Sequence, residues 1–305
     1  MEEISIKEYL KPYSRSELVY YLPNPGNGGD SLIACATFQI FRDLKIPYRL
    51  FDLQNHDPAG KIILYGGGGN LVSYYDHAAN FIKMVHQKAK KLILLPATID
   101  HHESLLRSLG SNVDIICRER TSCEYVETVT HKPHVMLADD LVFNLNVKEI
   151  LSQNSDSLLK ALCSELGFML RSSYKNKLSF PTFKELKLIL GKELKLFKLR
   201  NGNTLNCIRG GLEKTDVPLP DDNIDLSSFL THKKAINQAN SFWIANQLLR
   251  FINYFTTVRT NRLHISIASA LLNKEVFLYR NSYYKNEAVY RYSMEKRFPN
   301  VKFMG

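Results

Sequence analysis

The residues best suited to chemistry lie in a short polar turn between a predicted strand and a predicted helix. Arg259, Arg262 and His264 come at this turn, and the apolar segment 263–272 that follows is typical of a buried helix. A helix N-terminus favours anions because its first backbone N–H groups are unpaired and the helix dipole is positive there. Arginine adds paired donors that suit phosphate or carboxylate, and histidine can exchange a proton near neutral pH. The turn predicts an anion site with an acid–base group or, with about equal weight from these residues alone, a capped surface helix.

Such groups need a scaffold, and the first half of the chain predicts alternating strands and helices. Strands are predicted at 17–22, 48–53, 61–65, 91–96, 113–117 and 134–137. Helices are predicted at 31–44, with Asp30 or Ser31 as the N-cap, and at 77–89, 103–109 and 122–129. This alternation is typical of a parallel sheet covered by helices on both faces, in which ligands bind beyond the carboxyl ends of the strands.

The second half predicts a smaller α/β unit, with strands at 204–209, 254–258 and 275–279 and helices at 237–252 and 263–272. The alternation is lost between about 144 and 198, so we place the junction there and expect domains at 1–185 and 186–305. A cleft between two such units would bring their strand ends together.

Two glycine-rich loops follow predicted strands of the first half. Glycine allows tight turns and a close approach of the backbone to a ligand, so these loops predict a cradle for an anion or a sugar. A tight turn between strand and helix would use the same residues. Asp30, at the end of the first loop, could orient a hydroxyl or act as a base. The cradle residues are Asn27, Gly28, Gly29, Gly67, Gly68 and Asn70.

Other polar groups follow later strands. His102 lies in a cluster of one carboxylate and two imidazoles, but the cluster lacks a full set of ligand spacings, so no metal site is predicted. Arg118 and Arg120 lie at a predicted helix start, where Ser122 could simply be a cap. The carboxylates at 139 and 140 could also only cap a turn. At least five strand ends carry Gly, Arg, His or Asp, and this convergence is more informative than any single loop.

The composition favours an anionic partner. The net charge is +10, but lysines and aromatic residues are not interleaved as in nucleic-acid-binding modules, so no nucleic acid is expected. The segment 184–200 alternates basic and apolar residues and could lie on a membrane surface or form a solvated connector. Five scattered cysteines, an acidic N-terminus without an apolar signal region and the lack of a long apolar run predict a cytoplasmic protein with reduced thiols.

Taken in order, several of these pieces resemble the polysaccharide pyruvyl transferase family. They are Asn-Gly-Gly-Asp at 27–30, the glycine run at 66–70, Cys-Arg-Glu-Arg-Thr-Ser at 117–122, Arg-Leu-His at 262–264 with 268–274, Tyr-Arg-Asn-Ser-Tyr-Tyr-Lys-Asn at 279–286, and the segments 289–290 and 301–303. Two positions depart from the family pattern. Asn261 stands where an Asp is expected, and Gly210 and Gly211 precede Glu213 where an acidic residue is expected.

The resemblance implies a glycosyltransferase-B-like architecture of two Rossmann-like domains facing a cleft. It implies phosphoenolpyruvate as donor without a further cofactor, and a glycan or lipid-linked oligosaccharide as acceptor. The product would be a pyruvate ketal on a cell-surface or exopolysaccharide precursor, and a lipid-linked acceptor would itself lie at the inner membrane face. In this hypothesis His264 is the general acid or a donor to the leaving phosphate, and Asp30 handles the acceptor hydroxyl, with His102 in reserve. Arg118 and Arg262 bind the donor, helped by Lys285 and Asn286.

Two other functions stay open from the sequence. One is a nucleotide-sugar glycosyltransferase of the same architecture, which would need a base slot and a carboxylate for the ribose instead of two small-anion sites. The other is a non-catalytic binder of anionic lipid or glycan, which the segment 184–200 suggests.

Overall fold

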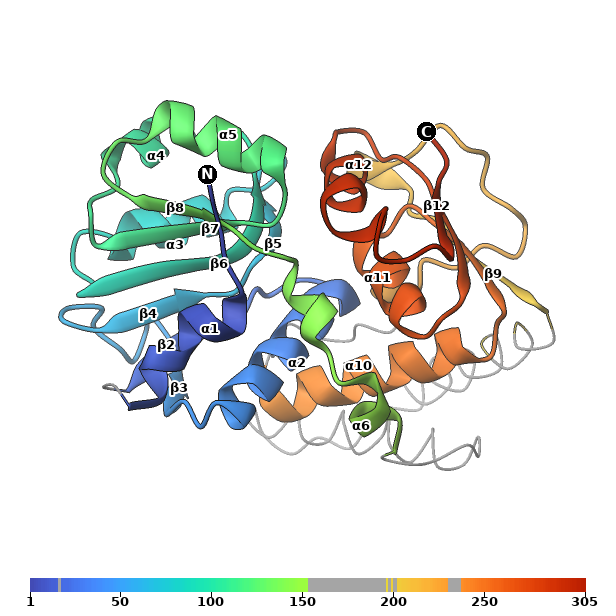
Figure 1. Ribbon diagram of the computed structural model, residues 1–305, viewed down its shortest axis with the longest axis horizontal. Coiled ribbons are helices and arrows are strands. Elements are labelled where there is room, and N and C mark those ends of the chain that lie inside the picture. Colours follow the sequence, from blue (N-terminus) through green and yellow to red (C-terminus); the bar gives the residue numbers. More distant parts are fainter. Residues whose placement is uncertain (16–17, 153–195, 197–198, 200–201, 230–236) are drawn as a thin grey trace.

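The computed structural model describes residues 1–15, 18–152, 196, 199, 202–229 and 237–305. The predicted junction at 185, most of the basic segment 184–200 and Cys163 lie outside these residues. Figure 1 shows the described chain as two α/β units, the N-terminal one on the left and the C-terminal one on the right. Among the described residues, no helix combines the length and the apolar character that crossing a bilayer requires.

The N-terminal unit is built on an eight-stranded sheet in which every pair of neighbouring strands is parallel. Its strands are β1 (Glu2–Glu3), β2 (Val19–Leu22), β3 (Tyr48–Leu50), β4 (Ile62–Tyr65), β5 (Gly68–Leu71), β6 (Lys91–Ile99), β7 (Val113–Cys117) and β8 (His134–Leu137). The order is β1-β8-β7-β6-β4-β2-β3, with β5 also paired to β6. The chain therefore runs outward in both directions from the β2–β4 pair, and such a switch point is where open α/β sheets bind ligands.

Helices cover both faces of this sheet. On β4, Ile62 and Leu64 pack in the core that includes α1 (Ile6–Leu10) and α2 (Gly28–Asp43), whereas Ile63 and Tyr65 pack in the core that includes α3 (His77–Val85), α4 (Glu103–Ser108) and α5 (Arg120–Val129). Successive side chains of a strand point to opposite faces, so an unbroken apolar strand must be buried on both.

The C-terminal unit has a four-stranded parallel sheet in the order β12-β11-β10-β9. Its strands are β9 (Thr204–Cys207), β10 (Thr257–Thr260), β11 (Glu275–Leu278) and β12 (Val301–Phe303). Helix α10 (Gln238–Asn253) precedes β10, α11 (Leu263–Leu271) joins β10 to β11, and α12 (Lys285–Val289) continues into a π-helical turn (Tyr290–Met294). Shorter described helices are η1 (Lys11–Arg15), η2 (Leu141–Asn144), α6 (Val147–Ser152), η3 (Gly211–Glu213) and α9 (Leu226–Phe229).

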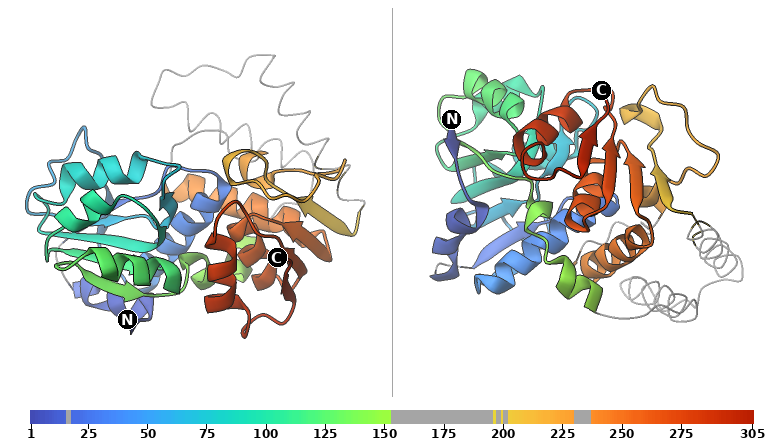
Figure 2. Two further views of the ribbon diagram at one scale, coloured as in Figure 1. Left: turned by 90° about the horizontal axis from the view of Figure 1, so that it is seen from above. Right: turned by 45° about the vertical axis from the view of Figure 1, so that its right-hand side comes forward.

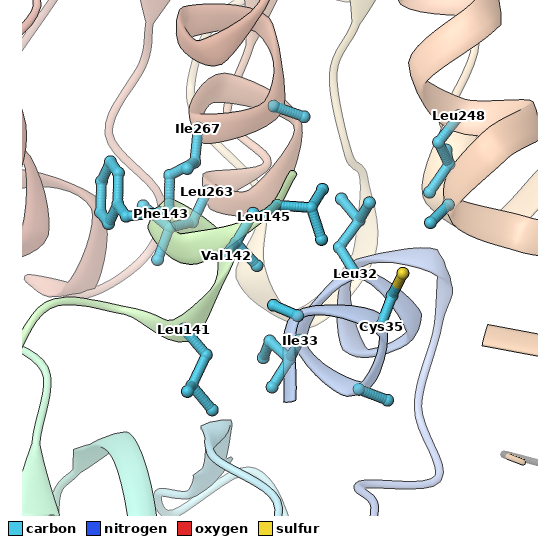
Figure 3. Close-up of a cluster of buried hydrophobic side chains, with 14 of the residues drawn as sticks. Leu32, Ile33, Cys35, Leu141, Val142, Phe143, Leu145, Leu248, Leu263 and Ile267 are labelled. Carbon is cyan, nitrogen blue, oxygen red and sulfur yellow. The ribbon is translucent and has the colours of Figure 1, made fainter. Parts of the chain in front are cut away.

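The two units share one hydrophobic core, in which α2 and η2 of the first half pack with α10 and α11 of the second. Figure 3 shows Leu32, Val142, Leu248 and Leu263 from these four elements gathered together. Figure 2 shows α2 and α10 side by side between the sheets. Burial of each such side chain contributes roughly 1.5–3 kcal/mol, so packing holds the strand ends of the two sheets in a fixed relation.

The predicted α/β class and parallel sheet are confirmed, and the strands at 113–117 and 134–137 match to the residue. Several element ends differ, including the strand predicted at 254–258, which is β10 at 257–260, and two further differences bear on the site. The helix expected from residue 31 begins at Gly28, with Asn27 as its N-cap, because the Asn27 side chain accepts the Gly29 N–H. Part of the predicted second glycine loop is a strand, since Gly68–Leu71 pairs with β6.

Candidate active site

A cavity of about 330 Å³ lies between the two units, where polar loops of both halves meet. The expected convergence of strand ends is therefore present. The residues that line the cavity lie on β5 or follow β2, β5, β7, β9 and β10, and Lys285 comes from α12. They are Asn24, Pro25, Gly26, Asn27, Asp30, Gly69, Asn70, Tyr75, His77, Arg118, Arg209, Glu213, Ser227, Asn261, Arg262, Leu263, His264 and Lys285.

Arg118, Asp140 and His264 form a buried cluster at one wall of the cavity. Nη1 of Arg118 lies 2.7 Å from Oδ2 of Asp140 and 3.2 Å from Nε2 of His264, and that Nε2 lies 3.4 Å from the same carboxylate oxygen. Arg118 and Asp140 are 1% and 0% exposed. Nε of Arg118 also donates to Thr98 Oγ1 at 2.9 Å. An ion pair removed from water is held this tightly only when its remaining polar atoms are also paired.

The Asp140 carboxylate is ionised despite its burial. Burial alone would raise the pKa of Asp140, but His264, Arg118 and the N–H of Val142 act against it and hold the pKa well below its usual value. Asp140 therefore places a permanent negative charge behind Arg118 and His264.

The N-terminus of α2 packs against the opposite edge of the His264 ring. A Cβ placed on Gly29 would lie 2.5 Å from Nδ1 of His264, which is closer than any real contact allows. A larger residue here would have to displace the His264 ring, so the segment that was predicted as a ligand cradle makes room for a histidine from the other half of the chain.

Asp30 completes the capping box of α2. Its Oδ2 accepts the Asn27 N–H at 2.9 Å, and its Oδ1 accepts from Asn24 Nδ2 at 2.8 Å. Burial raises the pKa of Asp30, while His264, the Asn27 N–H, Arg118 and Lys285 oppose that rise. A carboxylate in this position can still accept a proton from a hydroxyl, because each oxygen has a second lone pair.

A second charged cluster surrounds Glu213, which is 4% exposed. Its carboxylate accepts hydrogen bonds from Lys285 Nζ and from Tyr75 OH at 2.9 Å, and it forms an ion pair with Arg209 Nη1 at 3.1 Å. Burial acts to raise the pKa of Glu213, but Lys285 and Arg209 outweigh it and lower the pKa to about 2. Burial lowers the pKa of Lys285 to about 8, against the attraction of Glu213 and with help from the charge of Arg118.

Arg262 is the N-cap of α11 and lines the cavity, and it is held from behind by a carboxylate. Its Nε donates to Asp225 Oδ1 at 2.9 Å, and its Nη2 donates to Asp225 Oδ2 and to Ser228 Oγ. Next to it, Asn261 accepts the Arg209 N–H at 2.7 Å and donates to the Arg209 carbonyl at 3.2 Å. This pair of hydrogen bonds explains why Asn261 replaces the Asp of the family pattern, since an ionised Asp could not donate to the Arg209 carbonyl.

Of the predicted site residues, seven line the cavity: Asn27, Asp30, Asn70, Arg118, Arg262, His264 and Lys285. The others have contacts elsewhere. The Asn286 amide donates to the carbonyls of Asn261 and Tyr279, and His102 contacts the Val72 carbonyl. A Cβ on Gly67 would collide with the Pro96 carbonyl, and one on Gly28 would meet Leu248 and Ser227. Gly68 has φ +111° within β5.

Two arginines from the predicted anion turns point elsewhere. Arg259 is on β10 beside the Phe277 ring, and Arg120 is an exposed partner of Glu3. Sequence reasoning did not assign Asp140, Arg209 or Glu213 to the site. The expectation of an acidic residue after Arg209 could have identified Glu213, because the short helix η3 places Glu213 in the cavity wall. Among the described residues, no three His, Cys, Asp or Glu side chains are grouped to hold a metal ion.

The sequence profile of the polysaccharide pyruvyl transferase family matches residues 27–283. This chain belongs to the polysaccharide pyruvyl transferase family. It is 25% identical over 320 residues to EpsO of Bacillus subtilis (strain 168), whose name provisionally describes a pyruvyl transferase, and the match covers 96% of this chain and 91% of EpsO. It also resembles the crystal structure of a functionally uncharacterised protein from Klebsiella pneumoniae subsp. pneumoniae NTUH-K2044, with a TM-score of 0.73 and 27% identity over 98% of this chain and 96% of the other. Family membership makes the protein a pyruvyltransferase of polysaccharide biosynthesis, and the matched segment contains Asp30, Arg118 and His264.

Proposed function

We propose that this protein transfers the enolpyruvyl group of phosphoenolpyruvate to two hydroxyls of a sugar, forming a pyruvate ketal on a cell-surface or exopolysaccharide precursor. The observation that carries the proposal is the meeting of Arg118, His264 and Lys285 at one small cavity in a chain of this family. We further propose that the two α/β units form a glycosyltransferase-B-like pair and that no cofactor is needed besides the donor.

The charges of the cavity suit a small dianion. Four cationic side chains line its described walls against two carboxylates: Arg118, Arg209, Arg262 and Lys285 against Asp30 and Glu213. A Cβ on Gly69 would lie 3.1 Å from Arg118 Nη2 and 3.5 Å from Lys285 Cδ, so the glycine leaves space beside both cations. We place the phosphate and carboxylate of the donor between these cations and the N-terminus of α11.

The size of the cavity also favours phosphoenolpyruvate over a nucleotide sugar. Small-molecule sites usually measure about 300–1,000 Å³, and 330 Å³ is near the lower limit. A three-carbon donor and one sugar ring need no slot for a base.

The reaction needs one proton delivered to the donor and two hydroxyl protons removed from the acceptor. Protonation of the methylene carbon creates an oxocarbenium-like centre at C2, which one sugar hydroxyl attacks. The C2–O bond to phosphate breaks, and the second hydroxyl closes the ketal. One hydroxyl proton replaces the proton given to the methylene, and the other leaves with phosphate. His264 is the proposed acid, and Asp30, whose pKa burial raises, is the proposed base for the acceptor.

Asn27, Asn70 and Tyr75 line the same cavity and could hold the acceptor sugar by hydrogen bonds. A glycan or lipid-linked oligosaccharide would present that sugar, and a lipid-linked acceptor would place the enzyme in the cytoplasm at the inner membrane face.

The test is phosphate release from phosphoenolpyruvate with galactose, glucose and N-acetylmannosamine glycosides, followed by mass spectrometry. A product heavier by about 70 mass units would identify the ketal and the acceptor. Phosphoenolpyruvate at about 100 times its Kd should add roughly 2.7 kcal/mol of stability and raise the Tm, whereas UDP and CMP should not. The absence of both product and stabilisation, with a clear shift by UDP or CMP, would favour a nucleotide-sugar glycosyltransferase instead.

A further inference from the structure

Asp140 lies behind the cavity wall and is fully buried. It follows β8 in the N-terminal unit, whereas His264 lies in the first turn of α11 in the C-terminal unit, and the two are 124 positions apart. Oδ1 of Asp140 accepts the Val142 N–H at 2.9 Å, and Oδ2 faces both Arg118 and His264. One oxygen therefore fixes the carboxylate to its own turn, while the other points to the site.

The cluster restricts where the protons of His264 can be. Arg118 has no acceptor, so Nη1 at 3.2 Å can only donate to Nε2 of a neutral imidazole, and the ring proton must then be on Nδ1. When His264 carries two protons, Nε2 must donate, and the acceptor within reach is Asp140 Oδ2 at 3.4 Å. In both states Nδ1 bears a proton and faces the N-terminus of α2, where Gly29 leaves it room.

The charges lead to the same conclusion. An imidazolium 3.2 Å from a guanidinium is strongly disfavoured unless a negative charge compensates for it. Asp140 is within reach of both cations, and its carboxylate remains ionised because Arg118 and His264 hold its pKa down. The other ionisable groups that line the cavity come from α2, the segment after β5, the segment after β9, the turn before α11, and α12. They are Asp30, Tyr75, His77, Arg209, Glu213, Arg262 and Lys285.

We propose that Asp140 is the positioning residue of the proposed reaction: it neutralises Arg118 beside His264, so that His264 can carry the second proton that an acid needs. This inference rests on the proposed function, because the proton is the one delivered to the donor or to the leaving phosphate. Asp140 touches neither substrate and acts only through Arg118 and His264.

A double-mutant cycle tests the role in turnover. D140N should lower kcat about 10²-fold, within the ~10²–10⁴-fold range for loss of a positioned acid, and H264Q should lower it at least as much. Because Asp140 acts through His264, the double variant D140N/H264Q should be within about threefold of H264Q alone. D139N is the matched control, since Asp139 is the exposed neighbour that pairs with Arg297, and it should keep wild-type kcat. A double variant whose loss equals the product of the two single losses would overturn the proposal.

Nuclear magnetic resonance of ¹⁵N-histidine-labelled protein tests it without any substrate. The signal of His264 is identified by its disappearance in H264Q. D140N should lower the fraction of His264 rings with both nitrogens protonated at a given pH, and D139N should match the wild type. Identical titrations of D140N and wild type would overturn the proposal. If the wild type transfers no enolpyruvyl group, the proposed function fails, and this comparison still decides whether Asp140 controls the His264 proton.

A second variant covers the case in which D140N does not fold. R118Q removes the competing cation and leaves Asp140 in place, so His264 should become doubly protonated at a higher pH than in the wild type. A His264 titration in R118Q that matches the wild type, or moves to lower pH, would contradict the charge balance.

Discussion

Lys285 and Glu213 form an ion pair inside the cavity although they are 72 positions apart in the chain. The pKa values of both groups are below their usual values, but for different reasons. Burial lowers the pKa of Lys285 to about 8 in spite of Glu213, whereas the cations around Glu213 lower its pKa to about 2. The carboxylate is therefore charged throughout the physiological range, while the lysine is close to losing its proton.

The affinity for phosphoenolpyruvate should consequently fall in mild alkali. Lys285 is charged below its pKa and becomes neutral as the pH rises through about 8, so the KM for phosphoenolpyruvate should increase between pH 7 and 9. In K285Q the KM should be higher at pH 7 and should change little over this interval. K302Q, at an exposed lysine paired with Glu275, should keep the wild-type dependence. A wild-type KM that is flat up to pH 9 would remove Lys285 from donor binding.

Glu213 should also make stability depend on pH in the acid range. Its folded-state pKa of about 2 is below that of an unfolded glutamate, so its contribution is fully present above about pH 4.5 and is lost as the pH falls toward 2. E213Q should therefore lower the free energy of unfolding by roughly 2 kcal/mol at pH 6.5, and by less at pH 3. Urea unfolding at the two pH values measures this. E287Q, at an exposed glutamate paired with Arg291, serves as control and should differ little from the wild type at either pH. An E213Q deficit of equal size at pH 6.5 and pH 3 would mean that the Glu213 charge is not its cause.

Replacement of Gly29 should disable catalysis more than folding. The methyl group of G29A would lie 2.5 Å from Nδ1 of His264 and would have to displace the imidazole ring. A misplacement of a catalytic group by about 1 Å can lower the rate about 10²-fold. We expect kcat to fall about that much while the protein still unfolds cooperatively. G202A is the control, because a Cβ there would make only ordinary contacts beyond 3.6 Å. Wild-type kcat in G29A would show that His264 can shift without consequence.

The strands at 113–117 and 134–137 could be predicted because each is a short run ending in a recognisable polar loop, and local pattern is enough for that. Local pattern does not predict the direction in which a polar side chain points beyond the end of a strand. Arg118 and Arg120 are two positions apart, yet one is buried beside His264 and the other is an exposed partner of Glu3. Only the tertiary packing of the two halves decides between them.

The same limit explains why Asp140 and Glu213 were not assigned to the site. Each became part of it through a partner far away in the chain, His264 in one case and Lys285 in the other. Gly29 was predicted from the tight turn that glycine allows. In the structure its lack of a side chain also leaves room for the His264 ring. Sequence motifs locate such residues, but the pairs they form depend on the shared core of α2, α10 and α11.

Arg262 has two roles open to it in the structure, and two substitutions separate them. Its guanidinium binds Asp225 through two nitrogens and Ser228 through one, so it could serve only to attach the loop before α9 to the turn before α11. If Arg262 also binds the donor, R262Q should raise the KM for phosphoenolpyruvate at least about tenfold, because a charge-assisted bond to an anion contributes about 1.5–3 kcal/mol. D225N breaks the same pair but leaves the cation in the cavity, so its KM should stay within about threefold of the wild type and its loss should appear in the Tm. Steady-state kinetics and thermal unfolding of the two variants, measured together, decide the matter. Equal effects of R262Q and D225N on both quantities would make Arg262 a structural residue and leave donor binding to Arg118 and Lys285.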